Sequence, residues 1–596
     1  MTPLTVTERL AAYRDGTLDP RSELHRARAA ALADTHHTWI HVLDEAQLAP
    51  YLDRLAGLDP ASLPLYGIPF AIKDNIDLAG VPTTAGCPDY AYTPAESAFV
   101  VQRLIDAGAV PLGKTNLDQF ATGLVGTRSP YGACPNAFHR DYVAGGSSSG
   151  SALAVALGQV PFALGTDTAG SGRVPAAFNN LVGLKPTCGR LSTRGVVPAC
   201  RSLDAVSIFA GTAADAGRIL AVAGAYDDAD PYARADQPPP LGPGRIPAHG
   251  FRFAVPPAEQ RAFFGNAHTP ALFERAVARL QALGGVPVEL DFSPFLEAAR
   301  LLYEGPWVAE RYAAIRAFID RQPESLLAVT RTIIGAGSEP RAGDAFAAAY
   351  RLQALRRQAQ AAWQQVDLAI TPTAGTLPSQ AAVAAEPVAR NSELGYYTNF
   401  MNLLDCSAVA VPAGFQDEGL PFGVTLFAPA FYDTDLLGLA AQLHQTGVDT
   451  LGATGRPLPP SEPPPPDPGH AVELAVCGAH LSGLALNHQL TERRGRLLAT
   501  MQTAPRYRLY ALPGEAPQRP GLIRDRREGG AIEVEVWSLP AQEVGAFIAG
   551  IPAPLGIGRV ELADGRWIPG FLCEAAGLEG AEEITHLGGW RRYVGG

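Results

Sequence analysis

The stretch around which the chain is organised runs from Gly145 to Ser171 and reads GGSSSGSALAVALGQVPFALGTDTAGS. It predicts a glycine–serine loop, a small-residue helix, a short apolar strand and a second glycine-rich turn that ends in serine. Because glycine lacks a Cβ, the backbone N–H groups of such loops can crowd toward one point. The stretch therefore predicts a place that can hold an anion.

Two kinds of chemistry fit such a place. A phosphate-binding P-loop needs Lys and then Ser or Thr after its last glycine, but Gly150 is followed by Ser151 and Ala152, which excludes it. Nucleophilic catalysis needs a hydroxyl, a base and donors for an oxyanion. The stretch contains no His, and the informative basic residue is Lys73, in GIPFAIKDNID at positions 67–77.

A Lys after an apolar strand, a GGSS loop and a GTD-x-x-G-S turn together resemble the amidase signature family, over roughly Leu65 to Pro429. The resemblance implies a Ser-Ser-Lys catalytic unit. Lys73 is then the base, Ser147 the bridging serine that follows a cis peptide bond, and Ser171 the nucleophile. The family's GGSSGGS loop reads GGSSSGS here, so that a serine occupies one glycine position.

The implied chemistry sets a requirement on the lysine. An ordinary lysine has a pKa of ~10.4, so a base working near neutrality needs that value lowered by roughly 3 pH units, or about 4 kcal/mol. Burial behind an apolar strand lowers a lysine pKa in this way. Lys73 would draw the proton of Ser171 through the hydroxyl of Ser147. The oxyanion hole, worth on the order of 3 kcal/mol per donor, is assigned to the backbone N–H groups of Thr168, Ala169, Gly170 and Ser171.

Composition bounds the class of protein. A chain of 596 residues predicts two or more domains. Its net charge of −12 argues against nucleic acid or an anionic membrane as partner. The seven cysteines show no C-x-x-C spacing, so neither a disulfide framework nor a metal site is expected, and no cofactor is. The polar N-terminus and the lack of a long apolar run predict a cytoplasmic protein.

Periodicity predicts an α/β fold with a mixed central sheet covered by helices on both faces. A capping box at Thr5 and Glu8 predicts an N-terminal helix, and residues 36–57 are expected to be helical. The other expected elements are helices at 99–108 and 270–283, strands at 68–72, 109–116, 251–255, 286–290 and 367–373, and a packing segment at 397–402.

Two charged residues near the predicted site have open interpretations. Lys114 follows Gly113 in what is predicted to be a polar loop, and we expect a solvated or structural residue there. Asp167 either orders the nucleophile turn by accepting backbone N–H groups or acts as an ordinary Asx-turn residue.

The segment LLYEGPWVAERY, residues 301–312, resembles the substrate-selecting segment of allophanate hydrolases. The resemblance implies that Tyr303 and Arg311 hold the substrate carboxylate, and a guanidinium suits that task because its planar fork binds a carboxylate with two hydrogen bonds. We expect Gly305 and Pro306 to begin a helix, with Tyr303 in the preceding turn. The alternative is a surface arginine paired with a neighbouring acid such as Glu310.

Prolines dominate residues 457–468, PLPPSEPPPPDP, which predicts a semi-rigid spacer or, alternatively, a ligand for proline-binding modules. We expect an amidase domain at 1–456, a linker at 457–470 and a small β-rich domain at 471–596. The last resembles the allophanate hydrolase C-terminal domain, of γ-glutamylcyclotransferase-like fold, through GAHLSG, PLGIGRVELADG and GFLCE. His480 is the candidate catalytic residue there and His488 a weaker one, and a structural histidine is the alternative.

These resemblances together imply hydrolysis of the terminal amide of allophanate to ammonia and N-carboxycarbamate. That product loses carbon dioxide, with or without help from the C-terminal domain, in urea or s-triazine and cyanuric acid nitrogen catabolism. They also imply a homodimer and functional coupling to a urea carboxylase. Two alternatives stay open: another amidase of the family, such as the amidase component of an aminoacyl-tRNA amidotransferase, or a non-catalytic scaffold of the same fold.

Overall fold

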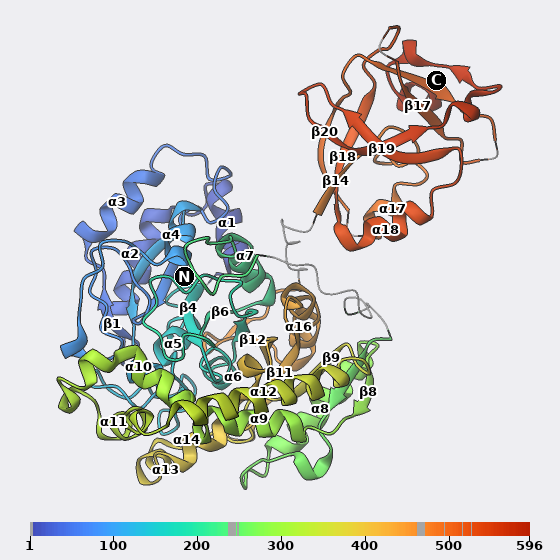
Figure 1. Cartoon of the computed structure of the whole chain (residues 1–596). Coiled ribbons are helices and arrows are strands. Elements are labelled where there is room, and N and C mark those ends of the chain that lie inside the picture. Colours follow the sequence, from blue (N-terminus) through green and yellow to red (C-terminus); the bar gives the residue numbers. More distant parts are fainter. Residues whose placement is uncertain are drawn as a thin grey trace. The chain divides into compact units, whose positions relative to one another are not determined.

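The computed structural model describes residues 4–235, 246, 250–461, 471–493, 495–514, 516–525 and 527–595. It divides into two compact units, Met1–Pro465 and Pro466–Gly596 (Figure 1). Most of the predicted spacer, residues 462–470, lies outside the described residues. Its first residue, Pro457, belongs to a short strand, β13 (Arg456–Pro457), that pairs with β12 (Thr450–Leu451).

The first unit is built on a mixed sheet of strands in the order β1-β3-β2-β4-β6-β5-β10-β11-β9-β7-β8. Parallel pairs at β2–β3, β2–β4, β7–β8 and β7–β9 are joined by antiparallel ones. The predicted fold class is confirmed. The strands are β1 (Trp39–Val42), β2 (Pro69–Lys73), β3 (Val110–Thr115), β4 (Phe162–Asp167), β5 (Val182–Lys185), β6 (Ala205–Ala210), β7 (Arg252–Val255), β8 (Val286–Glu289), β9 (Leu368–Pro372), β10 (Cys406–Phe415) and β11 (Pro421–Pro429).

Helices flank this sheet (Figure 1). They are α1 (Val6–Arg14), α2 (Pro20–Leu32), α3 (Glu45–Leu55), α4 (Phe99–Asp106), α5 (Ser149–Ala156), α6 (Val174–Phe178), α7 (Ala213–Ala223), α8 (Thr269–Ala282), α9 (Ser293–Glu304), α10 (Trp307–Ile319), α11 (Ala328–Gly335), α12 (Ala342–Ala362), α13 (Gln380–Ala385), α14 (Ala389–Leu394), α15 (Phe400–Leu403) and α16 (Asp433–Gly447). In the part of the chain that is described, none of the helices combines the length and apolarity needed to cross a bilayer.

The predicted helix at 36–57 is partly wrong. Residues Trp39–Val42 form the edge strand β1, which pairs antiparallel with β3, and only the following α3 is helical. A strand of four residues at the edge of a sheet owes its conformation to its neighbour, so local periodicity does not reveal it. The predicted N-terminal helix is confirmed, since the Thr5 side chain accepts from the Glu8 N–H and Glu8 caps in return.

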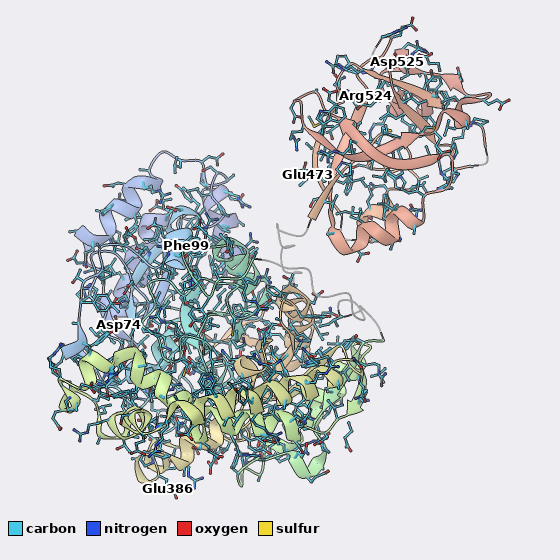
Figure 2. The ribbon with its side chains drawn as sticks, in the orientation of Figure 1. Asp74, Phe99, Glu386, Glu473, Arg524 and Asp525 are labelled. Atoms are coloured by element: carbon cyan, nitrogen blue, oxygen red, sulfur yellow. The ribbon has the colours of Figure 1, made fainter. Side chains whose placement is uncertain are left out.

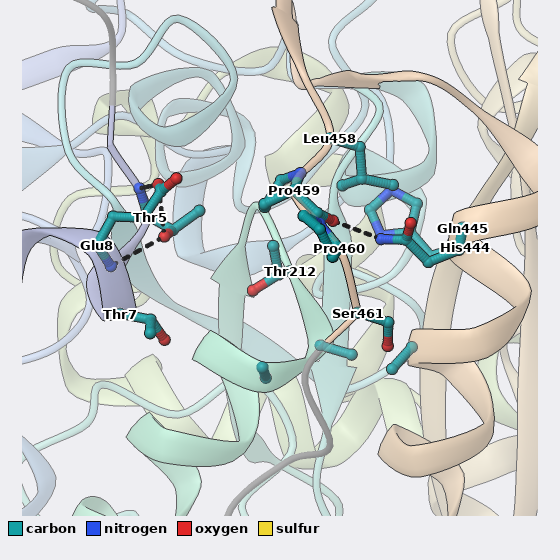
Figure 3. Close-up of a pocket in the computed structure, with 13 residues that line it drawn as sticks. Thr5, Thr7, Glu8, Thr212, His444, Gln445, Leu458, Pro459, Pro460 and Ser461 are labelled. Atoms are coloured by element: carbon teal, nitrogen blue, oxygen red, sulfur yellow. Dashed lines mark hydrogen bonds between the residues drawn. The ribbon is translucent and has the colours of Figure 1, made fainter.

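That capped end of α1 borders a pocket shared with α16 and the residues after β13 (Figure 3). There the Gln445 side-chain amide donates to the Pro459 carbonyl at 2.6 Å. The contact holds the last described segment of the first unit against its helices.

Two parallel neighbours place the chemistry-bearing motifs together. Strands β2 and β4 are buried along their whole length, and Phe70 stacks on Phe162 with 5.2 Å between ring centres. They pair in register, Ile72 opposite Leu164. Because the carboxyl ends of parallel strands meet at one edge of a sheet, Lys73 and the glycine-rich turn after Asp167 emerge side by side.

The second unit is β-rich, as predicted. It contains a sheet of order β15-β18-β14-β20-β19 and a smaller one of order β17-β16-β21. Its elements are β14 (Ala471–Val476), α17 (His488–Thr491), β15 (Arg496–Gln502), β16 (Tyr507–Ala511), β17 (Pro520–Arg524), β18 (Glu533–Pro540), α18 (Ala541–Ala549), β19 (Leu555–Glu561), β20 (Trp567–Cys573), β21 (Glu582–Glu583) and α19 (Trp590–Val594).

Candidate active site

Lys73 ends β2 and is fully buried. Its amine donates to the hydroxyl of Ser147 at 2.8 Å and to that of Thr166, on β4, at 2.6 Å. Both partners are neutral, and no carboxylate forms an ion pair with this amine among the described residues. An amine held in this way lacks the counter-charge that would keep it protonated.

Burial lowers the pKa of Lys73 from 10.5 to about 7. The negative charges of Asp118, Asp167 and Asp204 act in the opposite direction, and the positive charge of Arg311 acts with burial. Desolvation is the largest of these effects, as the sequence reasoning requires. At neutral pH a large fraction of the amine is therefore uncharged and can accept a proton.

Ser147 follows a cis peptide bond, Gly146–Ser147. Its carbonyl accepts from the backbone N–H of Asp118 at 3.1 Å. The neighbouring Ser148 hydroxyl donates to the Thr166 carbonyl at 3.1 Å, so the loop is tied to β4. Ser149, where the family has glycine, is the first residue of α5 and has no positive φ, so its Cβ fits the loop.

Ser171 closes the turn after β4 and is 3% exposed. Its hydroxyl lies 3.5 Å from the carbonyl of Gly123, and it has no direct hydrogen bond to Ser147 among the described contacts. Within the described chain, the backbone N–H groups of Thr168, Ala169 and Ser171 have no hydrogen-bond acceptor, whereas Gly170 donates to Asp167 Oδ1 at 2.7 Å. Gly170 therefore differs from the expected oxyanion donor, because its N–H is already used to shape the turn.

Asp167 holds that turn from below. It accepts from Gly172 N–H at 3.0 Å and from the Arg173 guanidinium at 2.8 and 2.9 Å, all fully buried. Burial alone would raise the pKa of Asp167, but the charge of Arg173 holds it below the ordinary value. Asp167 therefore orders the turn, which is the first of its two expected roles. The side chains of Thr398 and Asn402 also bond to carbonyls of the turn, so the segment 397–402 does more than pack.

A loop at residues 121–128 completes the other wall. The carboxylate of Asp118 accepts the backbone N–H groups of Val125, Gly126 and Arg128 at 3.2, 3.0 and 2.8 Å. A Cβ on Gly123 would lie 2.7 Å from that carboxylate, so only glycine fits there. The loop thus presents the Gly123 carbonyl to the Ser171 hydroxyl.

The same loop holds Arg311, which is 3% exposed. Its guanidinium donates to the Ala121 carbonyl at 3.3 Å, to the Thr122 hydroxyl at 3.2 Å and to the Tyr303 hydroxyl at 3.4 Å. The surface alternative is wrong, since Arg311 is buried and its neighbour Glu310 bonds Ser202 instead. Tyr303 lies in the last turn of α9 rather than in a free turn, because the α9 helix continues to Glu304.

Lys114 is a correction. It lies within β3 and is fully buried, paired with Asp74 at 3.0 Å and donating to the Thr83 hydroxyl at 3.0 Å (Figure 2 labels Asp74). The expectation of a polar loop is wrong, and of its two interpretations the structural one is correct. A buried pair of this kind fixes the residues after β2 against β3.

A comparison with known protein families matches residues 23–437 to the family described as Amidase. The chain belongs to the amidase family. Residues 472–595 match a second family, described as the allophanate hydrolase C-terminal domain. The amidase match covers the whole of the site described above.

Among curated proteins, this amidase is 46% identical to a urea amidolyase of Saccharomyces cerevisiae over 579 residues, 94% of this chain and 31% of that protein. A urea amidolyase of Lachancea kluyveri shares 46% over 93% of this chain. The chain spans 31% of the length of each of these two relatives. The amidase component of a glutamyl-tRNA(Gln) amidotransferase of Prochlorococcus marinus is 33% identical over 70% of this chain and 92% of its own length.

Among solved structures, a Kluyveromyces lactis allophanate hydrolase superposes with a TM-score of 0.81 at 42% identity. The match covers 100% of this chain and 99% of that one. A urea amidolyase of the same yeast gives the same score and identity but is covered over only 37% of its chain.

His480 lies in the second unit of this amidase. Its ring stacks on Phe571 with 5.0 Å between centres, contacts Phe547 edge-on at 5.3 Å, and its Nε2 lies 3.0 Å from Gln489 Oε1. Burial lowers its pKa, so the ring is neutral at pH 7. It borders a pocket that Arg519 also lines. His488 instead is exposed and bonds the Ala485 carbonyl.

Sequence reasoning missed several residues of this amidase site, namely Thr166, Asp118, Asp204 and Arg128. Asp204 accepts from the backbone N–H groups of Ala199 and Cys200 and from the hydroxyl of Thr168. One signal was available for Thr166, since it precedes Asp167 on a strand expected beside Lys73. The others act through folded loops and have no local signature.

Proposed function

We propose that the chain is an allophanate hydrolase. It hydrolyses the terminal amide of allophanate to ammonia and N-carboxycarbamate, which loses carbon dioxide to give ammonia and carbon dioxide overall. The observation that carries the proposal is a buried guanidinium, Arg311, held by Thr122 beside a lysine–serine pair whose amine titrates near neutrality. Full-length similarity to the Kluyveromyces lactis allophanate hydrolase supports it.

In the proposed acylation step, neutral Lys73 accepts the proton of Ser147 while Ser147 accepts that of Ser171. The Ser171 oxygen attacks the amide carbon, and the N–H groups of Thr168, Ala169 and Ser171 stabilise the oxyanion. The proton returns through Ser147 to the leaving nitrogen, and ammonia departs. Water then attacks the acyl-enzyme by the same route. Contact between Ser147 and Ser171 is expected to close when substrate fills the site.

The substrate carboxylate is assigned to Arg311 and Tyr303. The guanidinium keeps one N–H, at Nε, without a partner, although it is buried. The Tyr303 hydroxyl accepts from this guanidinium at 3.4 Å and can donate its own proton to a carboxylate oxygen. A neutral amide would leave the buried charge without an anion, so the pocket favours an anionic amide.

We extend the proposal to the second unit and to the domain division at 1–456, 457–470 and 471–596. His480, neutral and enclosed by aromatic rings, is proposed to assist loss of carbon dioxide from N-carboxycarbamate. The names of the yeast relatives, urea amidolyases three times as long, support coupling to a urea-carboxylating partner. A homodimer also remains part of the proposal.

The test is ammonia release by the purified chain from synthetic allophanate, with glutamine as the competing substrate. Wild type should consume allophanate and ignore glutamine, and Ser171→Ala should reduce the rate by at least ~10³-fold. Equal rates for the two enzymes, or a preference for glutamine, would overturn the proposal. Measuring carbon dioxide from His480→Ala separately tests the second unit.

A further inference from the structure

A second arginine, Arg128, lies at the same wall of the site and has no part in the chemistry above. It is 3% exposed, as is Arg311. Its guanidinium donates to the Thr122 carbonyl at 2.9 Å and to the Pro387 carbonyl at 2.7 Å. Thr122 thus joins the two arginines, because its carbonyl accepts from Arg128 and its hydroxyl accepts from Arg311.

The contact partners of both guanidinium groups are neutral oxygens. Neither arginine forms an ion pair with any described residue, and each has an unpartnered, buried Nε–H. Two carboxylates lie near enough to act on these charges, but they are committed elsewhere. Asp118 is bound by three backbone N–H groups, including that of Arg128, and Asp204 by two backbone N–H groups and Thr168.

Two like charges buried side by side are unfavourable unless an anion joins them. Burial lowers the pKa of Arg128, and the charge of Arg311 lowers it further, although the guanidinium stays protonated. A site that tolerates this arrangement when empty is suited to a ligand with more than one negative charge.

The proposed reaction creates such a ligand. Allophanate joins a terminal carboxamide through one N–H group to a carboxylate, and it carries one negative charge. When water replaces the amide nitrogen, the C–N bond breaks, a C–O bond forms, and the new carboxyl group gives its proton to ammonia. The products are an ammonium ion and a dicarboxylate, ⁻OOC–NH–COO⁻, which carries two charges. The second charge develops at the carbon that Ser171 attacks, and the Ser171 hydroxyl lies 3.5 Å from the carbonyl of Gly123, the neighbour of Thr122.

We propose that Arg128 is a specificity-determining residue that favours the second negative charge formed at the reacting carbon, while Arg311 holds the charge already present in the substrate. This inference rests on the proposed function. It assigns the two buried arginines different tasks, so replacing them should give different patterns of binding loss.

Two small acids distinguish these tasks. Malonate matches the doubly charged product with a methylene group in place of the N–H group, and malonamate, its half-amide, matches the singly charged substrate. Binding is measured by titration calorimetry in the Ser171→Ala background, which prevents turnover of malonamate. Arg311→Met should weaken both ligands by about tenfold or more, whereas Arg128→Met should weaken malonate by about tenfold and malonamate by less than about threefold.

Controls separate charge from folding. Arg128→Lys retains the charge but not the forked contacts, so it should keep most of the preference for malonate, and Arg128→Gln should lose it. Either neutral variant serves if the other unfolds, as judged by thermal melting. Equal weakening of both ligands by Arg128→Met or Arg128→Gln means that Arg128 only clamps the loop, and it overturns the inference, as does unchanged binding. Failure of the proposed function is recognised separately, because wild type would then release no ammonia from allophanate.

Discussion

The hydroxyl of Thr166 offers a direct test of the lysine base. It accepts a hydrogen bond from the Lys73 amine at 2.6 Å, and this contact stabilises the ammonium form more than the neutral form. A hydrogen bond to a charged group contributes about 1.5–3 kcal/mol and one between neutral groups about 0.5–1.5 kcal/mol. Thr166→Val removes the acceptor without changing the shape of the side chain, so the ammonium form loses about 1–1.5 kcal/mol more than the amine.

At about 1.4 kcal/mol per pH unit, the pKa of Lys73 should fall by about one pH unit in this variant. The wild-type pKa is about 7, and kcat/KM requires the neutral amine, so kcat/KM should fall as pH drops through 7. At about pH 6 the wild type should retain about a tenth of its plateau kcat/KM, and Thr166→Val about half of its own plateau.

The assay is the pH dependence of kcat/KM for allophanate between about pH 5 and pH 9, by ammonia release. Thr166→Ser keeps the hydroxyl and should keep the wild-type acid limb. The reasoning fails if the limb of Thr166→Val stays in place or moves to higher pH. It also fails if Lys73→Ala retains the wild-type rate at the plateau.

Three further substitutions probe the surroundings of the base. Arg311→Met should raise KM for allophanate by at least ~30-fold and leave a neutral amide such as propionamide unaffected, and equal losses on both would refute its role. Gly123→Ala should lower kcat/KM by about 100-fold, because its Cβ would lie 2.7 Å from the Asp118 carboxylate and displace the loop. Asp167→Asn leaves Arg173 buried without its counter-charge and should reduce the free energy of unfolding by about 3–5 kcal/mol in guanidinium titrations, whereas an unchanged midpoint would contradict the ion pair's importance.

The parts of the fold that could be predicted are those with strong local patterns. The apolar run before Lys73 and the alternation around Phe99–Thr115 predicted strands and a helix close to those observed. Trp39–Val42 could not be predicted, since its conformation depends on pairing with β3. The environment of Lys114 was equally hidden, because its partner Asp74 is forty residues earlier and approaches only through the parallel pairing of β2 with β3.

The site shows the same division. The motifs name Lys73 and Ser147, which the fold brings into hydrogen-bond contact. They say nothing of Thr166, whose contact with the amine comes from the register between β2 and β4. Nor do they show that Gly170 uses its N–H within the turn, which depends on the position of the Asp167 carboxylate.

The balance of charge around Lys73 explains how a lysine can serve where many hydrolases use histidine. Burial favours the neutral amine, and Asp118, Asp167 and Asp204 favour the ammonium ion. Each carboxylate accepts backbone N–H groups from a loop of the site, and none contacts the amine, so they act on it only at a distance. Direct contact would restore a high lysine pKa, and full absence would lower it well below neutrality. The carboxylates that shape the loops therefore also set the pKa of the base near 7, which couples the geometry of the site to its protonation state.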